Sequence, residues 1–339
     1  RQTYRAMRPL TVCPSTLAPG FSTFCPLARR LLFDGKTVSH IFPGISPADP
    51  DHKNVQNTAQ HIGRISLSGV QPKFSAVVGE DLRLRYTREN ERGHFILKPQ
   101  PSSYHIINRE FCAANENLTM QLASQVYRIE TAANGLCFYE NEEAAYITRR
   151  FDIHSGGKYM QEDFASLMGL TKSNGGADYK YSRASYEDCA DVIRRHVKAY
   201  RIDLLRFFRL VLFNFISLND DAHLKNFSLI NNGNEYRLTP AYDLINTSLH
   251  LVNHRIFALD KGLFKEGMQF SDVRQVCRKE FEEFGRRTGL NDKTVQRELD
   301  FFAAIHSEAE QIISRSYLSE ELKEQYRNSL DYRRKMLTF

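Results

Sequence analysis

The sequence predicts an α+β fold of two lobes, in which a small lobe rich in β-strands precedes a larger, mainly helical lobe. Two observations support this prediction. Residues 61–150 alternate short apolar segments of strand length with one helical segment, whereas residues 151–339 are helical in pattern except for one hairpin at 226–239. A chain of 339 residues is also long enough to favour two lobes over one small domain.

The small lobe and the segment before it divide into short elements. Residues 1–60 are rich in proline and are expected to pack on the small lobe, with a hairpin at 31–36. A helix is predicted from about residue 108 to 124, because Leu118, Leu122 and their neighbours follow helical spacing. The predicted strands are residues 73–78, 93–98, 135–140 and 144–148.

Composition excludes several classes of protein. Hydrophobic residues make up 42% and charged residues 25% of the chain, which is ordinary for a globular protein. The longest apolar run, residues 210–218, is interrupted by Asn214 and is too short to cross a bilayer. The six cysteines show no C-x-x-C spacing, so we expect free thiols in a reducing, cytoplasmic compartment and neither a zinc site nor a redox motif.

The segment that carries most chemical information runs from residue 218 to 226 and is followed by Asp243. Asp221 precedes Asn226 by five residues, and the predicted hairpin would return the chain so that Asn226 and Asp243 meet near Asp221. Phosphoryl transfer from ATP requires such a set: one Asp orients or deprotonates the attacking hydroxyl, and an Asn and a second Asp hold Mg²⁺. The same residue types also favour helix caps and turns, so a purely structural role is the alternative.

A lysine and a glutamate upstream extend this pattern. A kinase places a lysine on a strand to meet the nucleotide phosphates and a glutamate on a helix to hold that lysine. Residues 94–98 form an apolar strand that ends at Lys98, and Glu116 on the following helix is its favoured partner, with Glu110 as the alternative. A lysine at a strand end is otherwise usually a solvated edge charge.

Together these segments resemble the HipA-like serine/threonine kinases, the toxins of bacterial toxin–antitoxin systems. The resemblance covers about residues 60–250 and implies a protein-kinase-like fold of two lobes. The sequence lacks the His-Arg, Phe-Gly and G-x-G-x-x-G signatures of eukaryotic protein kinases, as that family does. The matching segments, in order, are residues 64–73, 95–99, 115–116, 150–152, 161–163, 221–228 and 238–243.

The resemblance assigns roles by position. Asp221 matches the catalytic aspartate, Asn226 and Asp243 match the Mg²⁺ ligands, and Lys98 with Glu116 matches the pair that binds the ATP phosphates. Arg150, Phe151 and Asp152 resemble the hinge that meets the adenine, mostly through its main chain.

Two further residues of the same segment are candidates. Lys225 is expected to neutralise charge on the transferring phosphoryl group, and His223 to orient the loop at the ATP site by a hydrogen bond. Either residue could instead be loop scaffolding.

The loop at residues 63–73 is expected to cover the phosphates. It carries Ser66 and Ser68, and within the family the position of Ser66 is an autophosphorylation site. A phosphoserine adds about two negative charges and competes with ATP for the same amides and lysine, so autophosphorylation is expected to lower activity. Most loop serines merely satisfy a turn, which is the alternative. The Ser-x-Ser arrangement, and the roughly 60 residues before it, resemble the short HipT branch most closely.

The resemblance implies an ATP- and Mg²⁺-dependent serine/threonine protein kinase that acts as a toxin. Its expected substrate is an aminoacyl-tRNA synthetase, tryptophanyl-tRNA synthetase for the short branch and glutamyl-tRNA synthetase for the longer one. The expected partners are a HipS-like small antitoxin and a HipB-like DNA-binding antitoxin. Two other functions stay open: a small-molecule phosphotransferase, since antibiotic and choline kinases also use Asp and Asn at this spacing, and a nucleotide-binding regulator without turnover.

Residues 284–297 resemble a helix-turn-helix with Gly289 at the turn, which could read DNA. Asp292 and Glu298 bring negative charge to the second helix, however, and its apolar positions look like core residues. We therefore expect the pair to pack internally and expect no direct DNA binding. The apolar positions are Val295, Leu299 and Phe302.

The last helix is predicted to begin after Ser319 as its N-cap and to bury one apolar stripe along Leu322, Tyr326 and Leu330. Part of the modest net charge of +6 lies near the C-terminal end of this helix. Basic residues at that end interact favourably with the helix dipole, so we expect them to form a solvent-exposed face of the helix.

Overall fold

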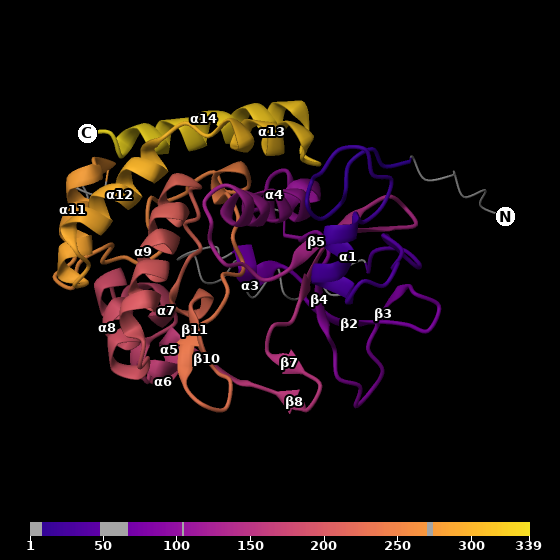
Figure 1. Ribbon diagram of the computed structural model, residues 1–339, viewed down its shortest axis with the longest axis horizontal. Coiled ribbons are helices and arrows are strands. Elements are labelled where there is room, and N and C mark those ends of the chain that lie inside the picture. The colour runs from indigo at the N-terminus through magenta and orange to yellow at the C-terminus, as the bar shows by residue number, and fades with distance from the viewer. Residues whose placement is uncertain (1–8, 48–66, 104, 270–273) are drawn as a thin grey trace.

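The computed structural model describes residues 9–47, 67–103, 105–269 and 274–339. Figure 1 shows the larger β-sheet at one end of the molecule and most helices of the second half at the other, with helix α4 between them. The predicted α+β architecture, a β-rich part followed by a mainly helical part, is confirmed.

The larger sheet has six strands in the order β1-β5-β6-β4-β2-β3, and its pairs are antiparallel except for β1 and β5. The four predicted strands are confirmed as β2, β4, β5 and β6. The short strands β1 and β3 were not predicted, because two or three residues carry no periodic signal. The bounds are β1 (Ile41–Phe42), β2 (Phe74–Val78), β3 (Leu84–Tyr86), β4 (Phe95–Lys98), β5 (Asn134–Tyr139) and β6 (Ala144–Arg149).

The N-terminal segment packs on this sheet through helix α1 (Pro26–Phe33). The hairpin expected at residues 31–36 is wrong, because the chain is helical to Phe33 and turns only at Asp34, whose φ is 52°. Proline at the first turn favours the helix, which buries Ala28 and Leu32, four residues apart, against the sheet. Burial of this apolar stripe outweighs the local turn signal.

Helix α4 (Cys112–Gln125) follows the short 3₁₀ helix η1 (Arg109–Phe111) and is buried on every side, since each residue from Cys112 to Ala123 is buried. Strands β5 and β6 contact one face, and helix α13 contacts another. In Figure 1 helices α13 and α14 extend along the top of the molecule above α4. Helix α4 is therefore held between the sheet and the C-terminal helices.

The helical part is built around α9 (Tyr200–Ile216), whose last seven residues, 210–216, are all buried. Helices α8, α12 and α14 contact α9. Most of the apolar run at 210–218 lies in the last two turns of this helix. The helices of this part are α5 (Phe164–Leu167), α6 (Lys172–Gly175), α7 (Tyr179–Ser182), α8 (Tyr186–His196), α11 (Arg278–Arg287), α12 (Asp292–Ala303), α13 (Ser307–Arg315) and α14 (Glu320–Met336).

The predicted hairpin is confirmed as β10 (Ser228–Asn231) and β11 (Tyr236–Leu238), paired in antiparallel register. Its turn contains Gly233, whose φ of 99° favours glycine. Strand β9 (Met160–Asp163), which was not predicted, completes a three-stranded sheet on the other side of β10. The small hairpin of β7 (Ile153–His154) and β8 (Gly157–Lys158) precedes it, and the 3₁₀ helices η2 (Leu224–Asn226) and η3 (Thr247–Leu249) flank β10 and β11 in the chain.

Helices α11 and α12 are an internally packed pair, as predicted. Asn291 caps α12 by accepting hydrogen bonds from the main-chain N–H groups of Lys293 and Thr294. The three apolar positions of α12 are buried, and Gly285 of α11 packs directly on Val295. The N-cap at Ser319 and the buried stripe of α14 are confirmed as well.

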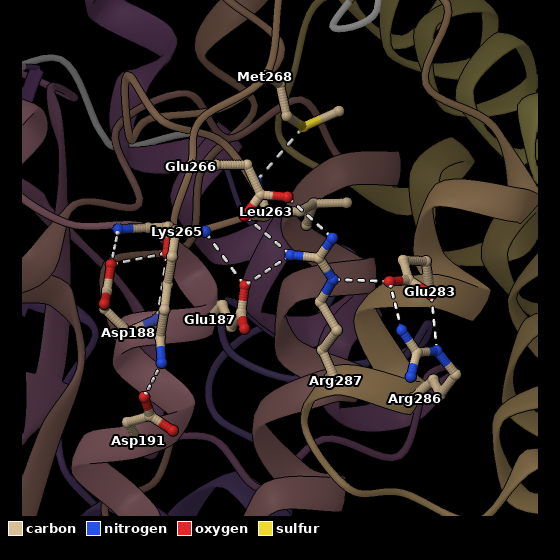
Figure 2. A network of polar contacts seen from close by, with 11 residues as sticks. Glu187, Asp188, Asp191, Leu263, Lys265, Glu266, Met268, Glu283, Arg286 and Arg287 are labelled. Carbon is tan, nitrogen blue, oxygen red and sulfur yellow. Dashed lines mark hydrogen bonds and ion pairs between the residues drawn. The ribbon is translucent and has the colours of Figure 1, made fainter.

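A network of ion pairs fixes the segment around residues 261–268 onto α8 and α11 (Figure 2). The guanidinium of Arg287 lies 3.3 Å from Glu187, 2.8 Å from Glu266 and 2.7 Å from Glu283. Lys265 pairs with Asp191, one helical turn after Glu187 on α8. Several shared partners make this network more ordered than an isolated surface ion pair.

None of the helices in the described ranges combines the length and apolarity needed to cross a membrane. The six cysteines are free thiols, as predicted.

Candidate functional site

Three buried or half-buried charged groups meet where β4, α4 and the segment after β11 come together. Lys98 is the last residue of β4, and its Nζ lies 2.6 Å from Oε1 of Glu116 on α4 and 2.5 Å from Oδ1 of Asp243. Glu116, rather than Glu110, is thus the helix partner of Lys98. The side chains of Lys98 and Glu116 are each only 3% exposed, so each charge depends on the other partners in the group.

The three groups shift one another's pKa values. Burial raises the pKa of Glu116 to about 6, with Asp243 acting in the same direction and Lys98 opposing. Burial would also raise the pKa of Asp243, but Lys98 and Lys73 hold it well below its ordinary value. Burial disfavours the charged form of Lys98, yet Asp243 and Glu116 raise its pKa above the usual range. Asp243 is therefore ionised at neutral pH, as a cation ligand must be.

Asp243 occupies an unusual backbone conformation, with φ of 55°. Asp tolerates this left-handed region better than most residues, at some cost in strain. The preceding residues hold it in place, because the main-chain N–H and C=O of Ala241 bond to Glu130 (2.8 Å) and Ala132 (2.9 Å). The hydroxyl of Tyr242 also donates to the main-chain oxygen of Lys225 at 3.1 Å.

The loop after α9 contains two neighbouring aspartates with different environments. Oδ2 of Asp220 accepts a hydrogen bond from the main-chain N–H of Arg255 at 2.6 Å, and the N–H of Asp220 donates to Thr247. Oδ1 of Asp221 accepts a hydrogen bond from the hydroxyl of Tyr181 at 2.8 Å. Asp220 anchors the loop to later segments, whereas Oδ1 of Asp221 lies beside Tyr181 and His223.

His223 connects Asp221 to Asn226. Its Nδ1 accepts from the main-chain N–H of Lys225 at 3.2 Å, and its Nε2 lies 3.9 Å from Oδ1 of Asp221. Burial lowers the pKa of His223 to about 4, although Asp221 opposes the shift. The neutral ring therefore carries its hydrogen on Nε2, which is buried and has no hydrogen-bond partner among the described residues.

Asn226 closes the set. Its Oδ1 accepts from the main-chain N–H of His223 at 3.3 Å, and its Nδ2 donates to Oδ2 of Asp243 at 3.3 Å. Consecutive contacts thus join Asp221, His223, Asn226 and Asp243. The hairpin brings Asn226 and Asp243 together, as expected. Lys225 lies apart: its half-exposed ammonium lies 4.0 Å from Oδ2 of Asp163.

The predicted hinge lies beside this group. The guanidinium of Arg150 bonds both carboxylate oxygens of Asp152, at 3.1 and 2.9 Å. The ring of Phe151 lies 6.0 Å from that of Tyr242, the residue before Asp243. The side chains of Arg150 and Asp152 therefore bind each other, and the ring of Phe151 lies beside that of Tyr242.

The predicted covering loop also approaches the site. Helix α3 (Leu67–Val70) buries Leu67 against Ile106, Cys112 and Ile245, and Nε2 of Gln71 donates to the main-chain oxygen of Pro99. Nζ of Lys73 lies 3.8 Å from Oδ2 of Asp243. Ser66 lies outside the described residues, and of Ser68 the structure describes the backbone, as part of α3.

Sequence reasoning missed Lys73 and Tyr181 as residues of the site. For Lys73 a signal existed, because it ends the loop that was expected to cover the phosphates. For Tyr181 none existed, since 40 residues separate it from Asp221 and only the tertiary fold joins them.

The available oxygen ligands fit Mg²⁺. The described part of the chain holds no group of three His, Cys, Asp or Glu side chains suited to a metal ion. Asn226 and Asp243 offer one amide and one carboxylate, and the amide oxygen has a second lone pair besides the one that His223 uses. Mg²⁺ characteristically binds through one or two carboxylates together with substrate phosphates and waters.

Comparisons with known proteins identify the family of the chain. A family model described as HipA-like C-terminal domain matches residues 65–311. A protein of Haemophilus influenzae named "Putative kinase" is 29% identical over 271 residues, which are 75% of this chain and 76% of the relative. A protein of Sinorhizobium fredii named "Putative kinase Y4dM" is 28% identical over 236 residues, 67% of this chain but 56% of the relative.

Among solved structures, the chain is similar to one from the complex of HipA, HipB and operator DNA of a Shewanella oneidensis MR-1 toxin–antitoxin system. The TM-score is 0.65 at 17% identity, and the match covers 86% of this chain and 74% of that one. At this identity the likeness shows a shared fold.

Proposed function

Because the chain belongs to the family of HipA-like C-terminal domains, we propose that it is an ATP- and Mg²⁺-dependent serine/threonine protein kinase that acts as the toxin of a bacterial toxin–antitoxin system. The observation that carries the proposal is the contact of Lys98 with both Glu116 and Asp243, joined through Asn226 and His223 to Asp221. Relatives named as kinases support the same class of reaction.

Each residue of the group has a task in this reaction. Lys98 binds the nucleotide phosphates and Glu116 holds its ammonium in place. Asn226 and Asp243 hold Mg²⁺, which when bound neutralises charge on the phosphates. His223 has a buried Nε2–H free of partners within the described residues, and it donates to the nucleotide. The segment at Phe151 meets the adenine.

Asp221 acts on the hydroxyl of the protein substrate. The hydroxyl oxygen attacks the γ-phosphorus, the bond from that phosphorus to the bridging oxygen breaks, and ADP leaves with the bonding electrons. The hydroxyl proton passes to the carboxylate of Asp221. Asp221 accepts a hydrogen bond from the hydroxyl of Tyr181, whereas Asp220 accepts one from the main chain of Arg255. Lys225, whose half-exposed ammonium lies beside Asp163, neutralises charge on the transferred group.

We also propose that the kinase phosphorylates its own Ser66 and Ser68 and that this lowers its activity. The support is that the same loop packs Leu67 beside Ile245 and brings Lys73 to 3.8 Å from Asp243. About two added negative charges per phosphate would compete with ATP for Lys73 and repel Asp243. Replacing both serines by Asp should weaken ATP binding, whereas the double Ala variant should bind ATP like the wild type. Equal ATP affinity in all three proteins would contradict this regulation.

The proposed partners follow from the family and from the Ser-x-Ser loop of the short HipT branch. They are a HipB-like DNA-binding antitoxin, as in the structure of the Shewanella complex, and a HipS-like small antitoxin. The proposed substrate is an aminoacyl-tRNA synthetase, tryptophanyl-tRNA synthetase first and glutamyl-tRNA synthetase second.

Labelled ATP separates this function from its alternatives. The purified chain is incubated with Mg²⁺, γ-labelled ATP and bacterial extract, and separately with each of the two purified synthetases. Label on a synthetase Ser or Thr, absent with the Asp221→Ala variant, is the expected result. Label on a metabolite alone would indicate a small-molecule phosphotransferase, and nucleotide binding without transfer would indicate a regulator; either result overturns the proposal.

A further inference from the structure

Tyr181 is a buried residue of α7 whose hydroxyl reaches the carboxylate of Asp221. Its side chain is 2% exposed, and its O–H donates to Oδ1 of Asp221 at 2.8 Å. The ring also meets the imidazole of His223 edge to face, with 5.0 Å between the ring centroids. Tyr181 therefore contacts two side chains of the candidate site but comes from outside the loop that carries them.

The position of Tyr181 is set from behind by a separate segment. Its main-chain oxygen accepts a hydrogen bond from the N–H of Asp260 at 2.9 Å. The next residues of that segment pair with the start of α8, through bonds from the N–H groups of Tyr186 and Glu187 to the oxygens of Gly262 and Leu263. The ion pairs of Figure 2 hold the same segment against α8 and α11. The hydroxyl of Tyr181 is thus presented by a fixed support.

We infer that Tyr181 is a positioning residue, which orients the carboxylate of Asp221 so that one oxygen accepts from tyrosine while the other faces the attacking hydroxyl. This inference rests on the proposed kinase function. The terminal torsion of an aspartate is soft and nearly two-fold, so a carboxylate held at one oxygen loses a freedom that it would otherwise keep. A hydrogen bond from a neutral hydroxyl to an ionised oxygen is also stronger than one between neutral groups.

The chain offers a matched control in Tyr186. This tyrosine is 1% exposed, and its hydroxyl donates at 3.0 Å to the main-chain oxygen of Ala222, the neighbour of Asp221. Tyr181→Phe and Tyr186→Phe each remove one buried hydroxyl that bonds the same loop. They differ in the acceptor, which is a reactive carboxylate for Tyr181 and a backbone carbonyl for Tyr186.

The test compares the 339-residue wild-type chain with both Phe variants. It uses protein labelling by γ-labelled ATP and Mg²⁺ in the extract or on the synthetase that the wild type labels. Tyr181→Phe should lower kcat about 10- to 100-fold, because small misplacements of a reacting group have effects of this size. Its KM for ATP, and its affinity for a non-hydrolysable ATP analogue with Mg²⁺, should stay within about twofold. Both Phe variants should lower the midpoint of thermal unfolding by similar amounts, because each removes one buried hydrogen bond. Tyr186→Phe should change kcat by less than about threefold.

A double variant separates positioning from general loosening of the loop. If Tyr181 acts through Asp221, then Tyr181→Phe should have no further effect on single-turnover labelling in an Asp221→Asn background. Multiplicative losses in the double variant, or equal kcat losses in the two Phe variants, would overturn the inference. A wild-type kcat in Tyr181→Phe would overturn it too and leave the kinase function standing. If the wild type itself transfers no phosphate, both fail together.

Discussion

Nζ of Lys98 lies 2.5 Å from Oδ1 of Asp243, although 145 residues separate the two in the chain. This contact joins the end of β4 to the segment after β11, and Glu116 adds helix α4 to the same point. One ammonium thus pairs with two carboxylates. The stability of the site and its proposed reaction consequently share the same group.

Replacing Lys98 by Met should lower both the stability of the protein and the rate of phosphate transfer. The side chain of Glu116 is 3% exposed, so removing its partner should lower the free energy of unfolding by about 3–5 kcal/mol at pH 7. The pKa of Glu116 is already raised to about 6 and would rise further without Lys98, so the variant's carboxyl takes up its proton at a higher pH than the wild-type one. The loss should therefore shrink as the pH falls from 7 toward 6, and little of this contribution should remain at pH 5. Urea unfolding at pH 5 and pH 7 measures both effects.

The double variant Lys98→Met, Glu116→Gln serves as the control. It should recover part of the lost stability, because the unpaired charge is gone, but it should transfer no phosphate. A Lys98→Met protein as stable as the wild type at pH 7 would show that the lysine does not balance the charge of the site.

Substitutions of Asp221 and Asp243 should affect different steps, turnover for Asp221 and nucleotide binding for Asp243. Asp243→Asn should weaken binding of a non-hydrolysable ATP analogue in the presence of Mg²⁺ by at least about tenfold, since a carboxylate ligand is lost. Asp221→Asn should bind the analogue normally and lose about 10²- to 10⁴-fold in turnover. Asp220→Asn is the neighbouring control, because its amide oxygen can still accept from Arg255, and it should keep its activity. Calorimetry and labelling give the two quantities. If Asp220→Asn lost turnover and Asp221→Asn kept it, the assignment of the base would be wrong.

His250 should make stability depend on pH. Its Nδ1 donates to the main-chain oxygen of Ile107, and its Nε2 accepts from Nδ2 of Asn115. The orientation of Asn115 follows from its Oδ1, which accepts from Asn246 and Thr119. Nε2 therefore faces a donor, and burial lowers the pKa of His250 to about 4.

The sign of this dependence follows from linkage. As the pH falls from 7 to 5 the unfolded histidine gains a proton and the folded one does not, so the free energy of unfolding should drop by about 2 kcal/mol from this residue. His250→Gln cannot titrate. The stability gap between wild type and variant, measured by urea unfolding, should therefore narrow by about that amount between pH 7 and pH 5. A gap that is the same at both values would contradict a neutral, buried His250.

Gly285→Ala should destabilise the helix pair α11–α12. A Cβ at Gly285 would lie 2.5 Å from Cγ2 of Val295, so the added methyl should cost about 1–3 kcal/mol. The loss is expected even though alanine favours a helix by about 1 kcal/mol over glycine. Val295→Ala in the same protein should relieve the clash, and a double-mutant cycle of urea unfolding measures the coupling. A stabilised Gly285→Ala variant would mean that the two helices do not pack closely.

Some of the site could be predicted because its signals are local. The five-residue spacing of Asp221 and Asn226, and the turn residues of the following hairpin, act over short stretches of chain. The hairpin then brings Asn226 to 3.3 Å from Asp243, since antiparallel strands return the chain to its start. Lys98 at a strand end was identified for the same reason.

Other features depend on competition between local and distant effects. Asp34-Gly35 favours a turn, and the sequence therefore predicted a hairpin. The burial of Ala28 and Leu32 against the sheet stabilises a helix instead, so residues up to Phe33 are helical. The sequence of residues 284–297 fits a DNA-binding helix-turn-helix as well as two helices packed in the core. The burial of Val295, Leu299 and Phe302 supports the two packed helices.

By itself, the sequence determined the α+β class, the order of the lobes and the residue types of the candidate site, because periodicity and spacing act between near neighbours. Tertiary structure alone decided that Glu116 rather than Glu110 meets Lys98, that Lys73 approaches Asp243, and that Tyr181 bonds Asp221. These contacts join residues at least 18 positions apart in the chain. The packing of buried elements selects which of these residues meet. A hydrogen bond or ion pair at these distances can form only once that packing has placed both groups.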